Sequence, residues 1–369
     1  MYNQNPFIFL FIRVFSKLDW VLMGALMVLM GLGAMTLYSA STENAGMIER
    51  QMIHFIAAFL VMLLFAQLPS GFLQHTAIWV YGAGLLVLVL VLVIGTTGKG
   101  AQRWLDLGVI RFQPSEIMKL AVPLMVARYF SDRVLPPRFI DIFIASFLVV
   151  IPVLLIAKQP DLGTSLLVAS AGFFVIFFAG ISWKWIFSII VSAMIAAPLL
   201  FFYGMHDYQR QRVLTLFDPA SDRLGSGYHI LQSMIAIGSG GRDGKGWLDG
   251  DQSRLNFLPE RHTDFIFAVF GEEFGFTGNL LLLALYLFII YRAMYLASKA
   301  KDTFSRLLGG SLALTFFIYL FVNTGMVSGI LPVVGVPLPL VSYGGTSMVT
   351  LMAAFGLLMG LRDKGRQYD

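Results

Sequence analysis

Residues 76–95 read TAIWVYGAGLLVLVLVLVIG and contain no charged side chain. A helix that crosses a bilayer needs about 20 mostly apolar residues, and this run supplies them. Comparable runs are centred near residues 20–40, 52–68, 115–131, 139–157, 163–181, 184–203, 264–291, 304–327 and 342–361. They predict an all-α fold, a polytopic integral membrane protein with about ten transmembrane helices.

The composition agrees with a membrane location. Of the 369 residues, 57% are hydrophobic and 13% are charged, whereas a soluble domain is about 25% charged. The absence of cysteine excludes disulfides, and the five histidines show no metal-ligand spacing. The net charge of +5 is small. We therefore expect no structural zinc site and no nucleic-acid partner.

The loops predict the orientation of the chain. An even number of spans places both ends on one side of the membrane. The segments 99–119 and 204–263 hold dense polar motifs, and outside them Lys and Arg gather on the side of the termini. We therefore expect a single transmembrane domain over 1–369, with residues 1–19 cytoplasmic or interfacial. In this scheme 204–263 is a large periplasmic loop between helices 7 and 8.

The first polar segment, 99–119, places charges at the start of a predicted membrane helix. Pro114 suits the first turn of that helix, and Glu116 and Lys119 then lie on one face, close enough to pair. Such a pair is costly in a membrane helix unless it faces protein or water. Two interpretations stay open: a pair that holds the helix end, or an anion site where Arg103, Arg111 and Lys119 converge.

Two aspartates stand where a polar segment meets an apolar run. Asp161 precedes the run 163–181, and Asp264 comes directly before Phe265. Each is suited to cap the helix that follows it. Asp264 also suits general-base chemistry, because burial at a low-dielectric boundary raises the pKa of a carboxyl group. Glu260 and His262 stand beside it and are further candidates.

The long segment 204–263 is basic and rich in glycine. Its basic residues include Arg210, Arg212, Arg254 and Arg261. A basic loop beside lipid favours attraction to phosphate-bearing headgroups. The run 239–241, Ser-Gly-Gly, permits tight turns and a close approach to a ligand. It is weak evidence for a phosphate loop, because no Walker arrangement follows it.

The last loop has irregular backbone at apparent membrane depth. Residues 335–347 read GVPLPLVSYGGTS and include Ser342. Such backbone is tolerated at that depth only where it is buried in protein or lines a cavity. We therefore expect an internal cavity next to the final helix.

Taken in order, these segments resemble one family. The motifs that carry the resemblance are Gln102-Arg-Trp-Leu, Arg111-Phe-Gln-Pro-Ser-Glu, Lys119, Gln159-Pro-Asp-Leu-Gly-Thr, Tyr208-Gln-Arg-Gln-Arg, Phe257-Leu-Pro-Glu, His262-Thr-Asp-Phe-Ile-Phe and Pro337-Leu-Pro-Leu-Val-Ser-Tyr-Gly-Gly. Each is weak alone, but together they span nearly the whole chain. They resemble the shape, elongation, division and sporulation (SEDS) family, and the short termini are most similar to its elongation member.

The resemblance implies a peptidoglycan glycosyltransferase of the bacterial cytoplasmic (inner) membrane that serves cell-wall biogenesis, cell shape and elongation. Its donor would be a glycan on undecaprenyl pyrophosphate and its acceptor lipid II. One inverting displacement at an α-linked donor gives a β-1,4 bond. Asp264 corresponds to the family's essential aspartate, which implies a general base on the periplasmic side.

The resemblance also implies roles for other residues. Candidates for diphosphate contacts are Arg50, Arg103, Arg111, Lys119, Arg210 and Arg212, and supporting residues are Glu116, Asp161, Glu260, His262 and Ser342. The expected partners are a class B penicillin-binding protein, which supplies the transpeptidase, and other membrane proteins of the elongation complex. No cofactor or protein metal site is evident, although magnesium or manganese is compatible with a diphosphate substrate.

Other functions stay open from the sequence. A lipid II flippase needs the basic cavity but no catalytic base. A scaffold that only activates its partner needs neither. An ion-coupled transporter is favoured by internal repeats, and none is visible in the sequence.

Overall fold

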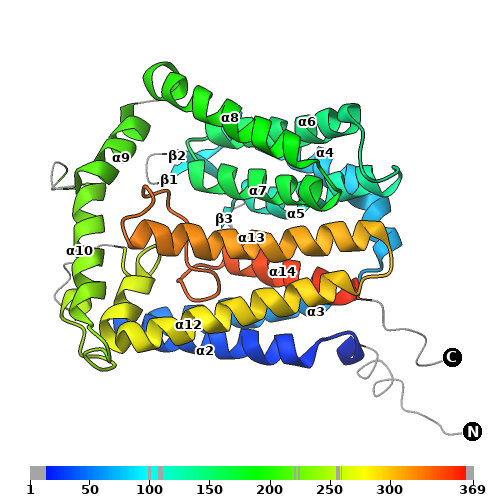
Figure 1. The fold of residues 1–369 in the computed structure, drawn as a ribbon. Helices are drawn as coiled ribbons and strands as arrows, with labels where there is room; N and C mark the ends of the chain where they lie inside the picture. The colour runs from blue at the N-terminus through cyan, green and yellow to red at the C-terminus, as the bar shows by residue number, and fades with distance from the viewer. Residues whose placement is uncertain are drawn as a thin grey trace, which may run out of the picture.

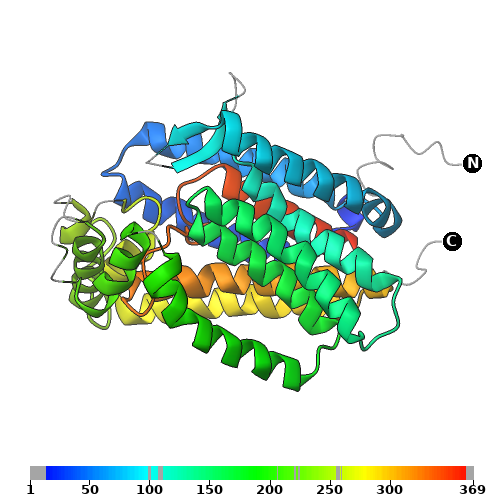
Figure 2. The same cartoon turned by 90° about the horizontal axis from the view of Figure 1, so that it is seen from above.

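A computed structural model describes residues 14–98, 101–106, 111–205, 207–219, 222, 225–254, 258 and 260–362. Each predicted apolar run falls on a helix of one elongated bundle (Figures 1 and 2). These helices are α2 (Trp20–Ala40), α3 (Ala45–Phe65), α4 (Ser70–Ile94), α5 (Pro114–Ser131), α6 (Phe139–Lys158), α7 (Leu162–Phe178), α8 (Trp183–Leu199), α12 (Ile266–Ser298), α13 (Thr303–Val327) and α14 (Thr346–Gly360). Most of the predicted interfacial segment 1–19 lies outside the described residues.

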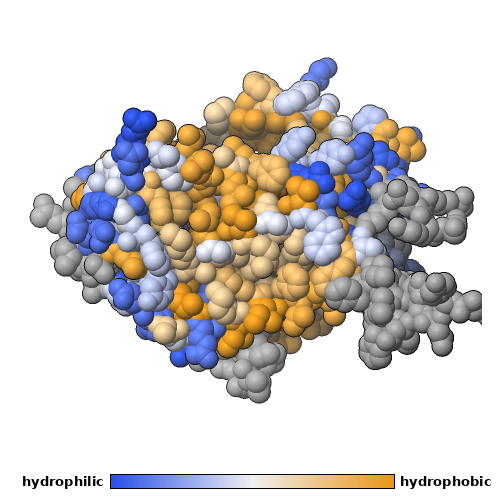
Figure 3. All heavy atoms as spheres, turned by 90° about the horizontal axis from the view of Figure 1, so that it is seen from below, coloured by the Kyte–Doolittle hydropathy of each residue, from blue (hydrophilic) through white to orange (hydrophobic). Residues whose placement is uncertain are grey.

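Six of the helices in the described part of the chain, α2, α3, α4, α6, α12 and α13, are long and apolar enough to cross a membrane. The surface accordingly shows an apolar belt between two polar ends (Figure 3). Helix α5 is less apolar because it lies inside the bundle, packed against α4, α7 and α13. Its charged Glu116 and Lys119 are each only 5% exposed, so they face protein rather than lipid.

Both ends of the described chain lie at the same end of the bundle. Asp19 caps α2 by accepting from the Leu22 N–H. Its carboxylate oxygen Oδ2 also forms ion pairs with Arg292 Nη2 of α12, at 2.7 Å, and with Arg362 Nη1, just after α14, at 3.1 Å. Asp19 therefore ties three helices together where the first and last spans meet, as an even number of spans requires.

The segments between the spans are more ordered than the sequence suggests. Three short strands form a small antiparallel sheet in the order β1 (Thr96–Gly98), β2 (Ala101–Asp106), β3 (Arg111–Phe112). The predicted loop 204–263 contains α9 (Asp207–Phe217), α10 (Ser226–Ser239) and α11 (Asp251–Arg254), and a π-helical turn, η1 (Leu200–Gly204), follows α8. The fold is helical apart from this one sheet in the described residues.

Helix α12 is broken, which the predicted run 264–291 did not anticipate. Gly275 has φ of 64° and interrupts the helical backbone. The loop after α10 packs against this break. The backbone N–H groups of Lys245 and Gly246 donate to the carbonyls of Glu272 and Glu273, respectively, both at 3.0 Å. A side chain at Gly240 or Gly244 would collide with that backbone. Gly240 and Gly244 thus permit a close approach of this loop to the backbone of α12.

Candidate functional site

Asp264 lies in the turn that leads into α12, but it does not cap the helix. The N-cap position belongs to Phe265, and no side chain there accepts a capping bond. Asp264 is partly exposed, and its Oδ2 faces Gly335, where an added Cβ would lie 3.6 Å away. The capping interpretation therefore fails for Asp264, and its position is consistent with a chemical role.

The backbone around Asp264 is clamped by buried side chains of the last loop and α13. Asn323 is fully buried, and its Nδ2 donates to the carbonyls of Asp264 and Val336, both at 2.8 Å. Ser342 Oγ donates to the Thr263 carbonyl at 2.5 Å and accepts from the Leu338 N–H at 2.8 Å. Ser342 therefore supports the Asp264 turn directly, joining residues far apart in sequence.

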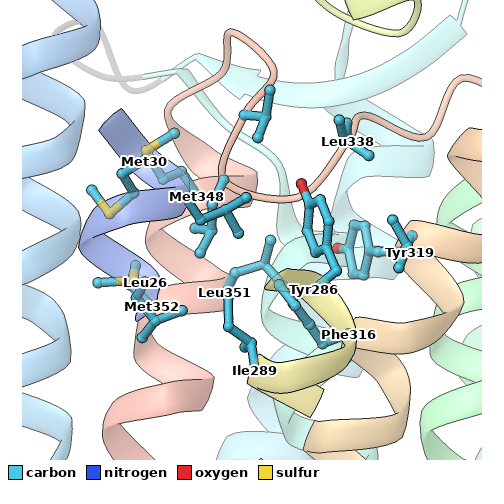
Figure 4. Close-up of a cluster of buried hydrophobic side chains, with 14 of the residues drawn as sticks. Leu26, Met30, Tyr286, Ile289, Phe316, Tyr319, Leu338, Met348, Leu351 and Met352 are labelled. Atoms are coloured by element: carbon cyan, nitrogen blue, oxygen red, sulfur yellow. The ribbon is translucent and has the colours of Figure 1, made fainter. Parts of the chain in front are cut away.

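The irregular segment 328–345 packs between helices. Tyr286 of α12 donates to the Pro339 carbonyl at 2.7 Å, and Figure 4 shows its hydroxyl reaching toward the segment that carries Leu338. At Gly163 of α7, an added Cβ would lie 2.7 Å from the Val334 carbonyl. The segment is thus held on several sides by protein. A void of about 20 Å³ does lie next to α14, lined by Lys119, Tyr319 and Thr350 among others, with room for about one water molecule.

Lys119 and Glu116 form a buried pair that α13 connects to Asp264. Lys119 Nζ lies 2.6 Å from Glu116 Oε1 and 2.5 Å from the hydroxyl of Tyr319. Tyr319 and Asn323 are four residues apart on α13, so they lie on the same face one turn apart. One rigid helix turn therefore fixes the spacing between the Lys119 pair and the clamp on Asp264.

Arg103 and Asp161 fasten the small sheet to the turn between α6 and α7. Arg103 donates to the carbonyls of Gln159, at 3.4 Å, and Pro160, and its Nη1 lies 3.9 Å from Asp161 Oδ1. Asp161 also caps α7 through Thr164 N and accepts from Gln113 Nε2 at 2.9 Å. The capping interpretation is confirmed for Asp161, and the observed contacts give Arg103 a structural use.

The described contacts of Arg210 and Arg212 lead to different segments. Arg212 Nη1 donates to the Val333 carbonyl at 3.0 Å, which places it beside the segment that approaches Asp264. Arg210 Nη2 donates to the Phe202 carbonyl at 2.7 Å, so it turns toward η1. Arg50 is exposed on α3. The Arg111 side chain lies outside what the structure describes.

The surroundings of His262, two residues before Asp264, favour its neutral form. Burial, and secondarily the Arg261 guanidinium, lower the pKa of His262 below its ordinary value of 6.5. Its Nδ1 lies 3.2 Å from the Ala40 carbonyl, so that nitrogen carries the proton in this contact and Nε2 is left as an acceptor. Glu260 is exposed, and its carboxylate accepts from the Thr263 hydroxyl at 2.9 Å.

Sequence reasoning missed several buried polar groups at this end of the bundle. Tyr319 and Asn323 carry the contacts described above, and a lone Asn within the apolar run 304–327 was the signal that could have found the second. Gln51 Oε1 and His54 Nδ1 on α3 are buried without a hydrogen-bond partner in the described structure. Their helix approaches the last loop, because the His54 ring lies 5.9 Å from that of Tyr343.

The described residues offer no protein metal centre. No group of three His, Cys, Asp or Glu side chains within them is close enough to hold an ion. Asp264, His262 and Glu260 therefore do not form a ligand set of their own.

Comparison with known proteins agrees with this architecture. The chain is 53% identical to the peptidoglycan glycosyltransferase MrdB of Escherichia coli K12 over 344 residues, 93% of each chain. It resembles one chain of a solved peptidoglycan synthase complex, described for the coordination of polymerization and crosslinking, with a TM-score of 0.82 and 32% identity over 92% of this chain and 96% of that one. The rod shape determining protein RodA of Thermus thermophilus matches with a TM-score of 0.70 and 30% identity over 93% and 95%.

The family comparison covers nearly the full length. The family model of FtsW, RodA and SpoVE, described as cell cycle proteins, matches residues 12–367. These are the proteins whose motifs the sequence resembles, in the same order along the chain. The chain therefore belongs to the FtsW, RodA and SpoVE family of cell cycle proteins.

Proposed function

We propose that this protein is a peptidoglycan glycosyltransferase that polymerises lipid II during cell elongation. The acceptor's 4-hydroxyl oxygen bonds to the anomeric carbon of the donor sugar, and the bond from that carbon to undecaprenyl pyrophosphate breaks. The hydroxyl proton passes to a base. Inversion at an α-linked donor gives a β-1,4 bond. The identity to a named peptidoglycan glycosyltransferase supports the reaction class.

Asp264 is our candidate for the base, and its clamped position is the observation that carries the assignment. Asp264 lies directly before the N-cap residue of α12, and Asn323 and Ser342 hold the backbone on either side of its Cα. Rotation of the turn is thereby restricted, which favours a base kept in one geometry toward its substrate. A general base of this kind contributes about 10²–10⁴-fold in rate.

The leaving diphosphate needs positive charge nearby. The candidate cations differ in how many of their N–H donors are already used in contacts within the protein. Lys119 already gives two donors to Glu116 and Tyr319, so its third donor is the one left for phosphate. Arg103 is engaged with the α6–α7 turn. Arg50, Arg210 and Arg212 lie nearer the surface, and Arg212 adjoins the segment that faces Asp264. We therefore expect Arg212 and Arg50 to contact the diphosphate directly. A divalent cation, if the reaction uses one, would arrive bound to the diphosphate.

The expected partner is a class B penicillin-binding protein, which would cross-link the glycan as it forms. The resemblance to a chain of a peptidoglycan synthase complex supports this assignment. Within the proposal, the end that carries α9, α10 and Asp264 faces the periplasm, where the lipid-linked sugars are used.

Labelling of single cysteines tests the orientation, since the chain has none of its own. Asp243 in the long loop and Ser298 at the opposite end of α12 are both exposed. In intact cells an impermeant thiol reagent should modify Asp243→Cys and spare Ser298→Cys. The reverse pattern would place the site on the cytoplasmic side and remove the proposed reaction from it.

Polymerisation of purified lipid II tests the function itself. The purified full-length chain, with and without its penicillin-binding partner, should convert lipid II into glycan strands that a muramidase digests. A scaffold would give no strands from the chain without another polymerase, and a flippase would move lipid II across vesicles without lengthening it. Either result would replace the proposed activity.

A further inference from the structure

A cavity at the end of the bundle opposite the long loop has no place in the polymerisation. Its volume is about 230 Å³, and it is lined by Ile78, Met125, Arg128, Tyr129, Asp132 and Arg133. Met125, Arg128, Tyr129 and Asp132 follow one another at the spacing of a single helix face, so the last turns of α5 form its floor. Ile78 contributes a wall from α4.

The cavity opens where a lipid headgroup would sit. Helix α5 ends at Ser131, and Asp132 directly after it is exposed. Ile78 is 46% exposed on the outer surface of α4, and the neighbouring Trp79 is 75% exposed. Tryptophan is enriched at the boundary between lipid and water. The lining therefore passes from an apolar, lipid-facing wall to charged groups within one cavity.

Two guanidinium groups are held in this cavity by contacts that use only part of their donors. Arg128 Nη1 donates to the Gln74 carbonyl, which fixes its head between α5 and α4. Arg133 lies over the Tyr129 ring, 5.1 Å from its centroid, and its Nε is 3.8 Å from Asp141 Oδ1. Each guanidinium has five N–H donors in a planar fork that suits phosphate oxygens.

The acidic groups decide which phosphate fits. Asp141 is buried and already accepts from the Tyr129 hydroxyl and the Arg138 N–H. Asp132 is exposed and lines the cavity itself, so it would repel a headgroup that carries only negative charge. A headgroup that joins a phosphate to a primary ammonium satisfies both signs at once.

We propose that this cavity binds an aminophospholipid, with phosphatidylethanolamine as the matching chemistry. The phosphate lies between Arg128 and Arg133, the ammonium pairs with Asp132, and the acyl chains follow Ile78 and Met125 outward. Basic pockets between transmembrane helices are known to hold lipid headgroups. Here the carboxylate adds selectivity against anionic lipids, and the site adjoins the turn between α5 and α6.

Native mass spectrometry of the full-length protein tests the proposal. Phosphatidylethanolamine, phosphatidylglycerol and phosphatidylcholine with identical chains are offered in equal amounts. The wild type should retain one phosphatidylethanolamine about tenfold better than either competitor, the ratio expected for one charge-assisted contact. Asp132→Asn should bring phosphatidylethanolamine and phosphatidylcholine within about twofold and raise phosphatidylglycerol.

Two further variants complete the design. Arg133→Gln should weaken all three lipids about tenfold, because it removes a phosphate contact. Arg306→Gln changes an exposed arginine outside the cavity lining, and it should leave lipid retention unchanged. Equal retention of the three lipids by the wild type would overturn the proposal. So would a wild-type preference for phosphatidylglycerol, or an unchanged lipid ranking in Asp132→Asn.

Discussion

The two ends of the bundle treat buried polar groups in opposite ways. At the end near the termini, both carboxylate oxygens of Asp19 are used, by Arg292, Arg362 and the Leu22 N–H. At the end near the long loop, buried atoms without a hydrogen-bond partner in the described structure accumulate. They include Gln51 Oε1, His54 Nδ1, Ser115 Oγ, Glu116 Oε2, His229 Nδ1, Glu272 Oε2, Asn279 Oδ1 and Asn323 Oδ1.

That difference separates a structural end from a functional one. A buried polar atom without a partner costs about 1–3 kcal/mol, so a closed scaffold would be expected to pair it. The Asp19 end follows that rule. The loop end does not, and it is the end that carries Asp264 and the Lys119 pair. The following variants probe which polar contacts at each end serve activity and which serve stability.

The largest effect is expected at Lys119. Lys119→Met leaves Glu116 buried without its partner, which should lower the free energy of unfolding by about 3–5 kcal/mol and abolish polymerisation. Adding Glu116→Gln removes the uncompensated charge and should restore most of the stability. Denaturant unfolding and lipid II polymerisation are measured on both proteins. Wild-type activity in the stable double variant would show that the Lys119–Glu116 pair serves only the stability of the fold.

Asn323→Leu should separate activity from stability. Leucine has a similar shape but donates nothing to the carbonyls of Asp264 and Val336, so the clamp on the Asp264 turn loosens. We expect polymerisation to fall about 10²-fold, as a small misplacement of a reacting group allows, with the pH profile of the remaining activity altered.

Ser311→Ala is the matched control for that loss. Ser311 is also fully buried on α13, and its hydroxyl donates to the Ala171 carbonyl at 2.6 Å, away from the site. Its loss should lower the melting temperature without changing the polymerisation rate per folded molecule. Equal rates in Asn323→Leu and Ser311→Ala would show that Asn323 only stabilises the helix.

Asp19→Asn should lower stability and leave activity unchanged, the opposite of the effect expected for Asn323→Leu. Burial alone would raise the pKa of Asp19, but the bonds from Arg292 and the Leu22 N–H outweigh it and lower that pKa. The two arginines are 24% and 35% exposed, so solvent screens part of the gain, and we expect a loss of about 1 kcal/mol. Melting temperature should fall while polymerisation per folded molecule stays within about twofold of wild type. A large loss of activity would contradict the division between the two ends.

Acid should weaken the loop end by a smaller amount. Burial lowers the pKa of both His229 and His262 below 6.5. As pH falls from 6.5 toward these folded-state values, the unfolded chain binds protons that the folded chain does not, so stability decreases. The melting temperature should drop between pH 7.5 and 5.5, and His262→Gln should flatten that slope by on the order of a degree or two. An unchanged slope would mean that His262 charges freely in the fold.

The sequence predicts the lipid-facing parts of this molecule well, because lipid exposure demands long apolar runs such as 76–95. It also places Asp264 at a loop–helix junction. It does not predict the break at Gly275, since a single glycine within an apolar run is also tolerated in a continuous helix. The close approach of the loop glycines to α12 was hidden for a related reason: their partner is backbone some 30 residues away, as Gly244 and Glu273 illustrate.

The site was harder to predict than the fold because its contacts are long-range. Lys119 and Tyr319 are 200 residues apart in sequence, so spacing along the chain does not reveal that pair. Arg103, a candidate for diphosphate contacts, likewise donates to the carbonyl of Gln159, which is 56 residues away. Short-range patterns did succeed where the partner is local, as with Glu116 and Lys119 three residues apart.

Asp264→Asn tests the central claim most directly. Because Phe265, not Asp264, occupies the N-cap of α12, asparagine should cost the fold little, while it cannot accept the acceptor hydroxyl's proton as a carboxylate does. The purified variant, with its partner, should keep wild-type melting temperature, partner binding and lipid II binding. Its polymerisation rate should fall by about 10²–10⁴-fold. Polymerisation within a few-fold of wild type would show that Asp264 is not the base and would move that role to Glu260 or His262.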